Sequence, residues 1–168
     1  SVAFEGDIQM QPVRQQMEEW REILEQSLRD QNFLLDYFPL VGLENELIHY
    51  EAMVRLKWQG EKLSAGQFLP WVNRLEISSE LDKHVVDLAL RSIETTGYPT
   101  AINLSVAAVV EPGFVSWIGE RFIAKSAAAK NLWIEIPEAM AFRHIQNFKS
   151  LCKRVKASGC KIGIEHVG

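Results

Sequence analysis

The chain has 168 residues, of which 47% are hydrophobic and 24% charged, a balance typical of one globular domain with a hydrophobic core. Its net charge of −4, without long runs of one sign, excludes a general attraction to nucleic acid or to an anionic membrane. No apolar stretch approaches the roughly 20 residues that span a bilayer. The two cysteines, Cys152 and Cys160, lack the paired spacing of a zinc site, and a disulfide framework in a domain of this size normally uses more of them. We expect a cytoplasmic segment that makes no membrane contact of its own.

The first half of the chain predicts a helix followed by a hairpin. Residues 1–12 mix Gly, Gln and Pro without a period, and we expect a linker or the tail of a preceding domain. Apolar residues then recur at three- and four-residue steps over residues 13–29, which predicts an amphipathic helix. Residues 33–41 and 47–58 are predicted strands, and the short linker of residues 42–46 indicates an antiparallel pair.

After the hairpin, helical stretches alternate with short apolar strands. Ser64 is a candidate N-cap for a helix that reaches Leu75, and Ser79 is expected to open a second helix that reaches Ile93. The other expected elements are a strand over 100–104, a helix around 114–125, a strand over 132–136, a helix over 140–157 and a strand over 160–164. This alternation predicts an α/β fold with parallel strands and helices outside them, an arrangement that a TIM-like (β/α) barrel has.

Four oxygen-bearing side chains occur on or at the ends of the predicted strands: Glu51, Asn103, Glu135 and Glu165. Because the working residues of a (β/α) barrel lie at the carboxyl ends of its strands, these side chains could meet at one mouth. Such a set suits a hard divalent cation such as magnesium, manganese or calcium, and no His/Cys set competes for zinc. The alternative is four unrelated polar residues, although Asn103 and Glu135 lie in apolar strands where a polar group needs a partner.

Several segments resemble the EAL domain family of cyclic di-GMP phosphodiesterases. The segment Tyr50-Glu51-Ala52-Met53-Val54-Arg55 is similar to the Glu-Ala-Leu signature and the arginine that follows it. Further matches come in the family's order: Tyr37-Phe38-Pro39, Phe68-Leu69-Pro70, Asn103-Leu104-Ser105, Glu135-Ile136-Pro137-Glu138 and Glu165-His166-Val167-Gly168. The resemblance implies that residues 13–168 are the N-terminal two-thirds of an EAL-type barrel with an antiparallel first strand, incomplete in this chain.

The resemblance also implies roles for particular residues. The positions that match Glu51, Asn103, Glu135 and Glu165 hold the metal in the family, which implies magnesium or manganese if this site retains an ion. The arginine that matches Arg55 contacts the phosphate of cyclic di-GMP, and its planar, permanently charged group suits that role. Met53 shares a strand face with Glu51 and Arg55 and completes the predicted ligand-binding set. The alternative for Arg55 is a surface ion pair.

Departures from the family pattern weaken the catalytic match. Glu165 and His166 stand where the enzymes have two adjacent aspartates, and a neutral imidazole adds no negative charge to a site for hard cations. Phe38 replaces a glutamine that contacts the ligand, and it could stack on a base or be a core aromatic residue. Pro137 replaces the usual threonine, and Asn73 stands where many members have a glutamate.

We therefore expect a catalytically inactive EAL domain that requires no cofactor and acts as a cyclic di-GMP receptor. This pattern resembles the LapD-like group of membrane receptors with tandem GGDEF and EAL domains, which implies a homodimer and a membrane-anchored parent protein. Two alternatives stay open. The retained Glu51, Asn103 and Glu135 are compatible with an active phosphodiesterase, whereas Phe38 and His166 are compatible with a protein-interaction module that binds no nucleotide.

Overall fold

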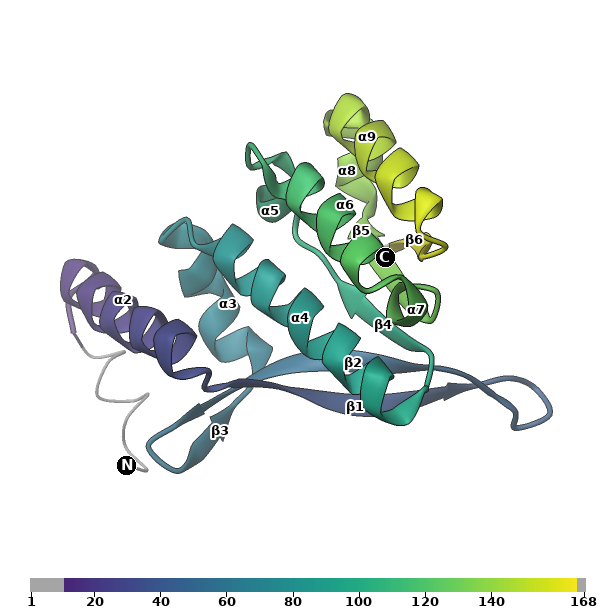
Figure 1. Cartoon of the computed structure of the whole chain (residues 1–168). Helices are drawn as coiled ribbons and strands as arrows, with labels where there is room; N and C mark the ends of the chain where they lie inside the picture. The colour runs from purple at the N-terminus through teal and green to yellow at the C-terminus, as the bar shows by residue number, and fades with distance from the viewer. Residues whose placement is uncertain (1–10, 166–168) are drawn as a thin grey trace.

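A long antiparallel hairpin forms one side of the molecule in the computed structural model, which describes residues 11–165 (Figure 1). Strand β1 (Phe33–Val41) pairs with β2 (Leu47–Trp58), and both strands have the predicted bounds. Phe38 lies directly opposite Glu51 across the pair. Because directly opposite residues in an antiparallel pair point to the same face, both strands contribute side chains to one surface of the sheet.

The chain then adds a short strand that the sequence analysis missed. Strand β3 (Glu61–Leu63) returns along β2, with Trp58 opposite Glu61. The two residues between them, Gln59 and Gly60, have φ angles of 49° and 81°. Positive φ at both central positions is the type I′ geometry that suits the twist of a two-residue hairpin. The sequence signal for this turn was the pair Gln59-Gly60, which directly follows the alternating strand.

Three parallel strands extend the sheet from the other edge of β2. They are β4 (Thr100–Asn103), β5 (Leu132–Pro137) and β6 (Lys161–Glu165), each within one residue of its predicted ends. The order is β1-β2-β4-β5-β6, with β3 pairing β2 outside this path. The predicted α/β class, the antiparallel first pair and the parallel succession are confirmed. Across residues 11–165 the sheet stays open.

The helices lie along one side of this sheet (Figure 1). They are α2 (Val13–Asp30), α3 (Ala65–Arg74), α4 (Ser78–Thr96), α5 (Val106–Val110), α6 (Phe114–Ala124), α7 (Ser126–Ala129), α8 (Glu138–Arg143) and α9 (Ile145–Ala157). Ser64 precedes α3 as predicted, and its backbone N–H donates to Gln67 Oε1 at 2.7 Å, which satisfies a free donor at the helix start. Helix α4 begins at Ser78, one residue before the predicted Ser79. Among residues 11–165, none of these helices has both the length and the apolar character needed to cross a bilayer.

The predicted helix over 140–157 is wrong as a single element. The backbone leaves the helical conformation at His144, with φ −133° and ψ 52°, and the two parts are α8 and α9. Met140 of α8 and Leu151 of α9, on either side of the break, are both fully buried. Neither Gly nor Pro marks the break, so the sequence carried no signal for it.

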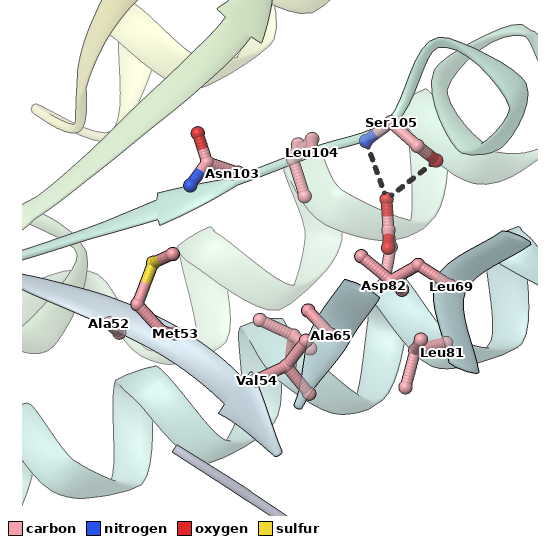
Figure 2. Close-up of a pocket in the computed structure, with 11 residues that line it drawn as sticks. Ala52, Met53, Val54, Ala65, Leu69, Leu81, Asp82, Asn103, Leu104 and Ser105 are labelled. Carbon is pink, nitrogen blue, oxygen red and sulfur yellow. Dashed lines mark hydrogen bonds between the residues drawn. The ribbon is translucent and has the colours of Figure 1, made fainter. Parts of the chain in front are cut away.

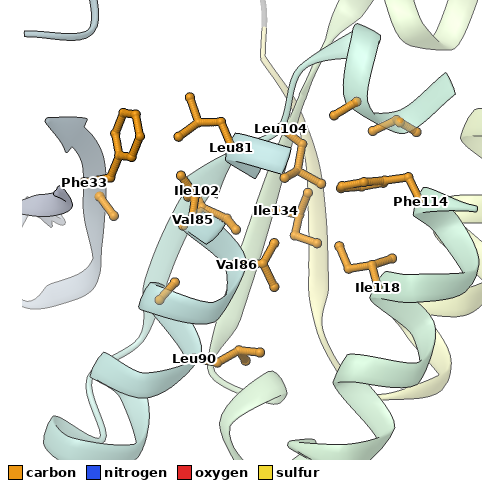
Figure 3. Close-up of a cluster of buried hydrophobic side chains, with 14 of the residues drawn as sticks. Phe33, Leu81, Val85, Val86, Leu90, Ile102, Leu104, Phe114, Ile118 and Ile134 are labelled. Atoms are coloured by element: carbon orange, nitrogen blue, oxygen red, sulfur yellow. The ribbon is translucent and has the colours of Figure 1, made fainter. Parts of the chain in front are cut away.

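The core lies between the sheet and the helices. Ile102 of β4 and Ile134 of β5 meet Val86 of α4 and Phe114 and Ile118 of α6, all fully buried (Figure 3). Burial of an aliphatic or aromatic side chain of this size contributes about 1.5–3 kcal/mol each. The opposite face of the sheet is free to carry polar side chains. The predicted linker, residues 1–12, lies outside the described residues except for Gln11 and Pro12, which precede α2 without helical structure.

Candidate functional site

Four of the predicted site residues meet on the face of the sheet away from the helical core. Asn103 and Glu135 are register partners at neighbouring positions of β4 and β5. With its amide nitrogen turned toward the acids, Asn103 donates to Glu165 Oε2 at 3.1 Å and to Glu135 Oε2 at 3.3 Å. The carboxyl group of Glu51 lies within hydrogen-bonding reach of that of Glu135. Strands β2, β4, β5 and β6 thus bring the four side chains together, whereas their roles stay predictions.

The electrostatics of this cluster favour a proton or a cation. The pKa of Glu135 is raised from 4.5 to about 7, first by burial, then by the charge of Glu51 and a hydrogen bond with it, and then by the charge of Glu165. His49 opposes this shift. Carboxylates that crowd one another cannot all ionise at low cost, so one of them holds its proton near neutrality unless a cation enters.

The donor set fits a divalent ion. In the opposite amide orientation, the Asn103 oxygen faces only other acceptors, an arrangement that a cation between them would stabilise. Glu51, Asn103, Glu135 and Glu165 would then supply the oxygen ligands. Burial is the first cause of the raised pKa of Glu135, and the charges of Glu51 and Glu165 add to it, so a cation would offset these charges.

One further residue of the cluster was missed. Nε2 of His49 lies 2.9 Å from Glu51 Oε1, and the imidazole packs against the Trp133 indole with ring centroids 5.0 Å apart. Ligand atoms of His49, Glu51 and Glu135 all lie within 4.8 Å of one another. His49 thus adds a nitrogen donor to a cluster for which the sequence predicted oxygen ligands. The signal was available, because His49 is two residues before Glu51 and so lies on the same strand face.

The predicted phosphate ligand Arg55 lies on the same face, in an ion pair. Its Nε is 3.3 Å from Asp36 Oδ2, and Lys62 Nζ is 2.8 Å from Asp36 Oδ1. The hydrogen bond from Lys62 is the largest cause that lowers the pKa of Asp36, and the charges of Lys62 and Arg55 lower it further. Two cations against one carboxylate leave one positive charge in excess, so the group still attracts an anion.

Next to the cluster, the surface is hollowed between β2, β4 and helices α3 and α4. The hollow has a volume of about 240 Å³. It is lined by Ala52, Met53, Val54, Ala65, Leu69, Leu81, Asp82, Val85, Asn103, Leu104 and Ser105. Met53 and Asn103 project to the same side of their strands in Figure 2. Phe38 is 48% exposed, so it is not the core aromatic residue that one interpretation of the sequence favoured.

A buried acid forms one wall of this hollow and was also missed. Asp82 of α4 accepts hydrogen bonds from the backbone N–H and the hydroxyl of Ser105, at 2.8 and 2.9 Å (Figure 2). Burial raises its pKa from 3.8 to about 6, although both bonds from Ser105 act in the opposite direction. Only 8% of the residue is exposed. The sequence signal for Asp82 was an acid at a helix position that faces the core, because a buried acid needs hydrogen-bond partners.

Comparison with known proteins finds a matching family and several relatives. The family model of the EAL domain matches residues 21–168 of this chain. The RNase E specificity factor CsrD of Escherichia coli K12 is 26% identical over 154 residues, which cover 89% of this chain and 23% of CsrD. The chain thus spans less than a quarter of that relative.

Solved structures share the fold. The FimX EAL domain of Xanthomonas citri, in complex with c-diGMP, superposes with a TM-score of 0.80 at 27% identity, over 90% of this chain and 61% of that one. The apo S helix-GGDEF-EAL structure of Vibrio cholerae LapD superposes with a TM-score of 0.83 at 23% identity, over 88% of this chain and 37% of that one. At the latter identity the likeness concerns the fold alone.

Proposed function

The chain belongs to the EAL domain family, and from this premise we propose that it is a receptor that binds cyclic di-GMP without hydrolysing it. The observation that carries the proposal is the contrast between two parts of one site. Arg55 has the residue type that the family uses for the phosphate, and Glu51, Asn103 and Glu135 have those that it uses for the first metal, whereas Glu165 and His166 stand where its enzymes have two aspartates. His166 lies outside the described residues, so this part of the argument rests on its chemistry.

Recognition of the phosphate is assigned to Arg55. Its guanidinium lies on the strand face that also carries Glu51, and the ion pair with Asp36 fixes its position. A planar group with several N–H donors can keep one contact to a carboxylate and direct others at a phosphate oxygen. Lys62, which holds the other oxygen of Asp36, adds a second positive charge nearby. Cyclic di-GMP carries two phosphates, so a local excess of positive charge favours its binding.

Recognition of a base is assigned to the hollow beside the cluster. Its volume of about 240 Å³ is below the roughly 300–1,000 Å³ of pockets that enclose a whole drug-sized ligand, so it suits one part of the dinucleotide. Met53 supplies a polarisable surface, and the Asp82 carboxylate supplies an acceptor for N–H groups of a guanine edge. Phe38, exposed on the same hairpin face as Glu51, offers an aromatic ring for stacking.

The proposed loss of hydrolysis follows from the two positions where this chain lacks the family's aspartates. A divalent ion at this site would polarise a phosphate oxygen and neutralise developing charge. In-line displacement benefits from two such ions, each held by suitably placed carboxylates. Glu165 is one methylene longer than aspartate, and His166 supplies no carboxylate, so the second position lacks its ligand. Binding needs only phosphate, base and shape contacts, and these can outlast catalysis.

The test is calorimetry with cyclic di-GMP, followed by chromatography of the same mixture after incubation with magnesium or manganese. We expect saturable binding and unchanged dinucleotide. If the unmodified chain instead opens cyclic di-GMP to the linear dinucleotide and Glu51→Ala does not, the chain is an active phosphodiesterase and the claim of inactivity is overturned. The Glu51→Ala variant also serves as the control for a contaminating enzyme.

A second candidate function is a protein-interaction module that binds no nucleotide. It is favoured by the similarity to CsrD, whose name describes an RNase E specificity factor. Absence of any heat of binding with cyclic di-GMP, in a sample with native circular dichroism, would favour it. Dimerisation and a membrane-anchored, cytoplasm-facing parent protein are further parts of the proposal. Analytical ultracentrifugation with and without cyclic di-GMP tests the first of them.

A further inference from the structure

Helices α6 and α9 lie side by side and border a groove on the helical side of the molecule (Figure 1). The groove has a volume of about 540 Å³. Its lining combines small, aliphatic and basic side chains: Gly119, Ile123, Ser150, Lys153, Arg154, Ala157 and Ser158. On α9 these positions follow steps of three and four residues, so they form one stripe along the helix. The proposed receptor function uses none of them.

The two cations of this groove have no acidic partner. Lys153 and Arg154 are exposed, and within residues 11–165 neither lies within ion-pair distance of a carboxylate. The neighbouring groove, between α4 and α6, contains acids among its basic side chains, and Lys125 there pairs with Glu94 at 3.1 Å. The groove between α6 and α9 thus carries positive charge that no acid of its own lining balances.

Basic charge extends along α9 beside the groove. The positions Lys149, Lys153 and Lys156 are all exposed and recur at steps of four and three residues, about one helical turn each. Residues 139–164 contain no Asp or Glu, although the whole chain has a net charge of −4. Because the lysines are interleaved with apolar residues, only the folded helix brings them together on one surface.

The side chain of Arg154 lies across α6 at a glycine. A Cβ atom at Gly119 would lie 2.9 Å from Cδ of Arg154 and 3.2 Å from its Nη1, so the arginine packs directly on the backbone of α6. One turn later on α6, Ile123 is 72% exposed. The groove therefore presents an oriented guanidinium near an exposed aliphatic side chain. An apolar contact bordered by charged side chains is typical of a surface that binds another protein.

We propose that the groove between α6 and α9 docks an acidic amphipathic helix of a partner protein. Carboxylates one turn apart on such a helix match Lys149 and Lys153, which are one turn apart on α9, and an aliphatic side chain between them contacts Ile123. Nucleic acid fits less well, because the lining residues include no aromatic side chain on which a base could stack. The inference goes beyond the receptor function and does not depend on it.

The probe is an acetylated helical peptide of about 16 residues, slightly longer than α9, with Glu one turn apart beside a stripe of Leu and with Ala and Gln elsewhere. Two-dimensional NMR of the isotope-labelled chain detects even weak binding. We expect the amide signals of Gly119, Ile123 and Ser158 to shift as peptide is added, whereas that of Glu51, on the other face of the sheet, stays in place. The same titration gives the affinity.

Lys153→Gln/Arg154→Gln should weaken peptide binding about five- to thirtyfold, the range for loss of two exposed ion pairs. Arg14→Gln/Arg29→Gln is the matched control, because it removes the same charge from exposed positions of α2, and it should keep the affinity. Added salt should weaken binding to the unmodified chain more than binding to Lys153→Gln/Arg154→Gln. Ile123→Ser should weaken binding at low and high salt alike, since it removes an apolar contact.

Unchanged amide signals at millimolar peptide would overturn the proposal, as would equal affinity in Lys153→Gln/Arg154→Gln and in the α2 control. Two further results would assign the groove to another occupant and so also overturn it. One is a short oligouridylate that shifts the same amides at lower concentration than the peptide. The other is self-association of the unmodified chain that Lys153→Gln/Arg154→Gln abolishes. Calorimetry with cyclic di-GMP on the same variants is a separate readout, so failure of the groove is distinguishable from failure of the receptor function.

Discussion

Nε of Arg55 lies 3.3 Å from Oδ2 of Asp36, a contact that joins the two strands of the hairpin on its site face. Lys62 of β3 reaches the other oxygen of Asp36 at 2.8 Å. The arginine that is expected to meet the ligand's phosphate is thus already oriented by a neighbouring acid. Asp36 has two opposite consequences, because it positions the guanidinium and also competes with the phosphate for it.

Arg55→Ala should weaken cyclic di-GMP binding by about 1.5–3 kcal/mol, the range for a hydrogen bond to a charged group. The measurement is calorimetry at moderate salt. Arg91→Ala, an arginine on the outer helix α4, is the matched control and should leave the affinity unchanged. If Arg55→Ala binds as tightly as the unmodified chain, Arg55 has no role in recognition.

Asp36→Asn should have the opposite effect and tighten binding severalfold, because it removes a negative charge beside the phosphate while keeping the shape of the side chain. The gain should shrink as salt is added, since the charges involved are near solvent and screened. Titrations at low and high salt measure this. Weaker binding at both salt concentrations would mean that orientation of Arg55 outweighs the competition.

Asp82 should make the stability of the fold depend on pH. Its pKa is 3.8 in the unfolded chain and about 6 in the folded state, so the folded state keeps a proton that the unfolded chain has lost between these values. The contribution is therefore fully present below pH 3.8 and is lost as pH rises through 6, by about 3 kcal/mol in total. Urea unfolding at several pH values measures it.

Asp82→Asn cannot ionise, so the difference in free energy of unfolding between this variant and the unmodified chain should change over the same pH interval. Asp30→Asn, which removes a carboxylate at the exposed end of α2, is the control for the substitution itself. A difference for Asp82→Asn that stays constant over this pH interval would contradict the raised pKa.

Glu135 should couple ion binding to proton release. Its pKa of about 7 means that a large share of the protein carries this proton at pH 6, and an ion that uses the carboxylate must displace it. Affinity for a divalent ion should therefore rise with pH up to about 7 and then level off. Calorimetry at pH 6 in buffers of different ionisation enthalpy should report proton release that Glu135→Gln abolishes. Pipes and cacodylate are suitable buffers. Proton release that persists in Glu135→Gln would show that the displaced proton comes from another acid.

The long elements were predictable because their patterns are local. The period-two alternation of residues 47–58 predicted both ends of strand β2. The helical spacing of residues 13–29 predicted the start of helix α2. Strand β3 was not predicted because a three-residue strand has almost no period, although Gln59 and Gly60 marked the turn before it. The break at His144 was not predicted because it has neither Gly nor Pro, and tertiary packing decides it.

The candidate site was predictable in part for the same reason. Glu51, Asn103 and Glu135 stood out as polar residues within strands, and the geometry brings them together. His49 was overlooked because a lone histidine in a strand is usually structural, although its spacing of two residues from Glu51 placed both side chains on one face. Asp82 was hidden within an amphipathic helix, where its contact with Ser105, 23 residues later, cannot be inferred from sequence spacing.

The register of the hairpin also limits which insertions and substitutions this chain can accept during evolution. Phe38 lies opposite Glu51 and Asp36 lies opposite Met53, so all four side chains share one face only in this alignment. Insertion of a single residue within β1 would exchange that set for Leu35 and Tyr37, because alternate residues of a strand point to opposite faces. Length variation is therefore tolerable in the turn of residues 42–46 and at the register shift between Leu40 and Val41, but not along residues 33–40, where change should proceed by substitution.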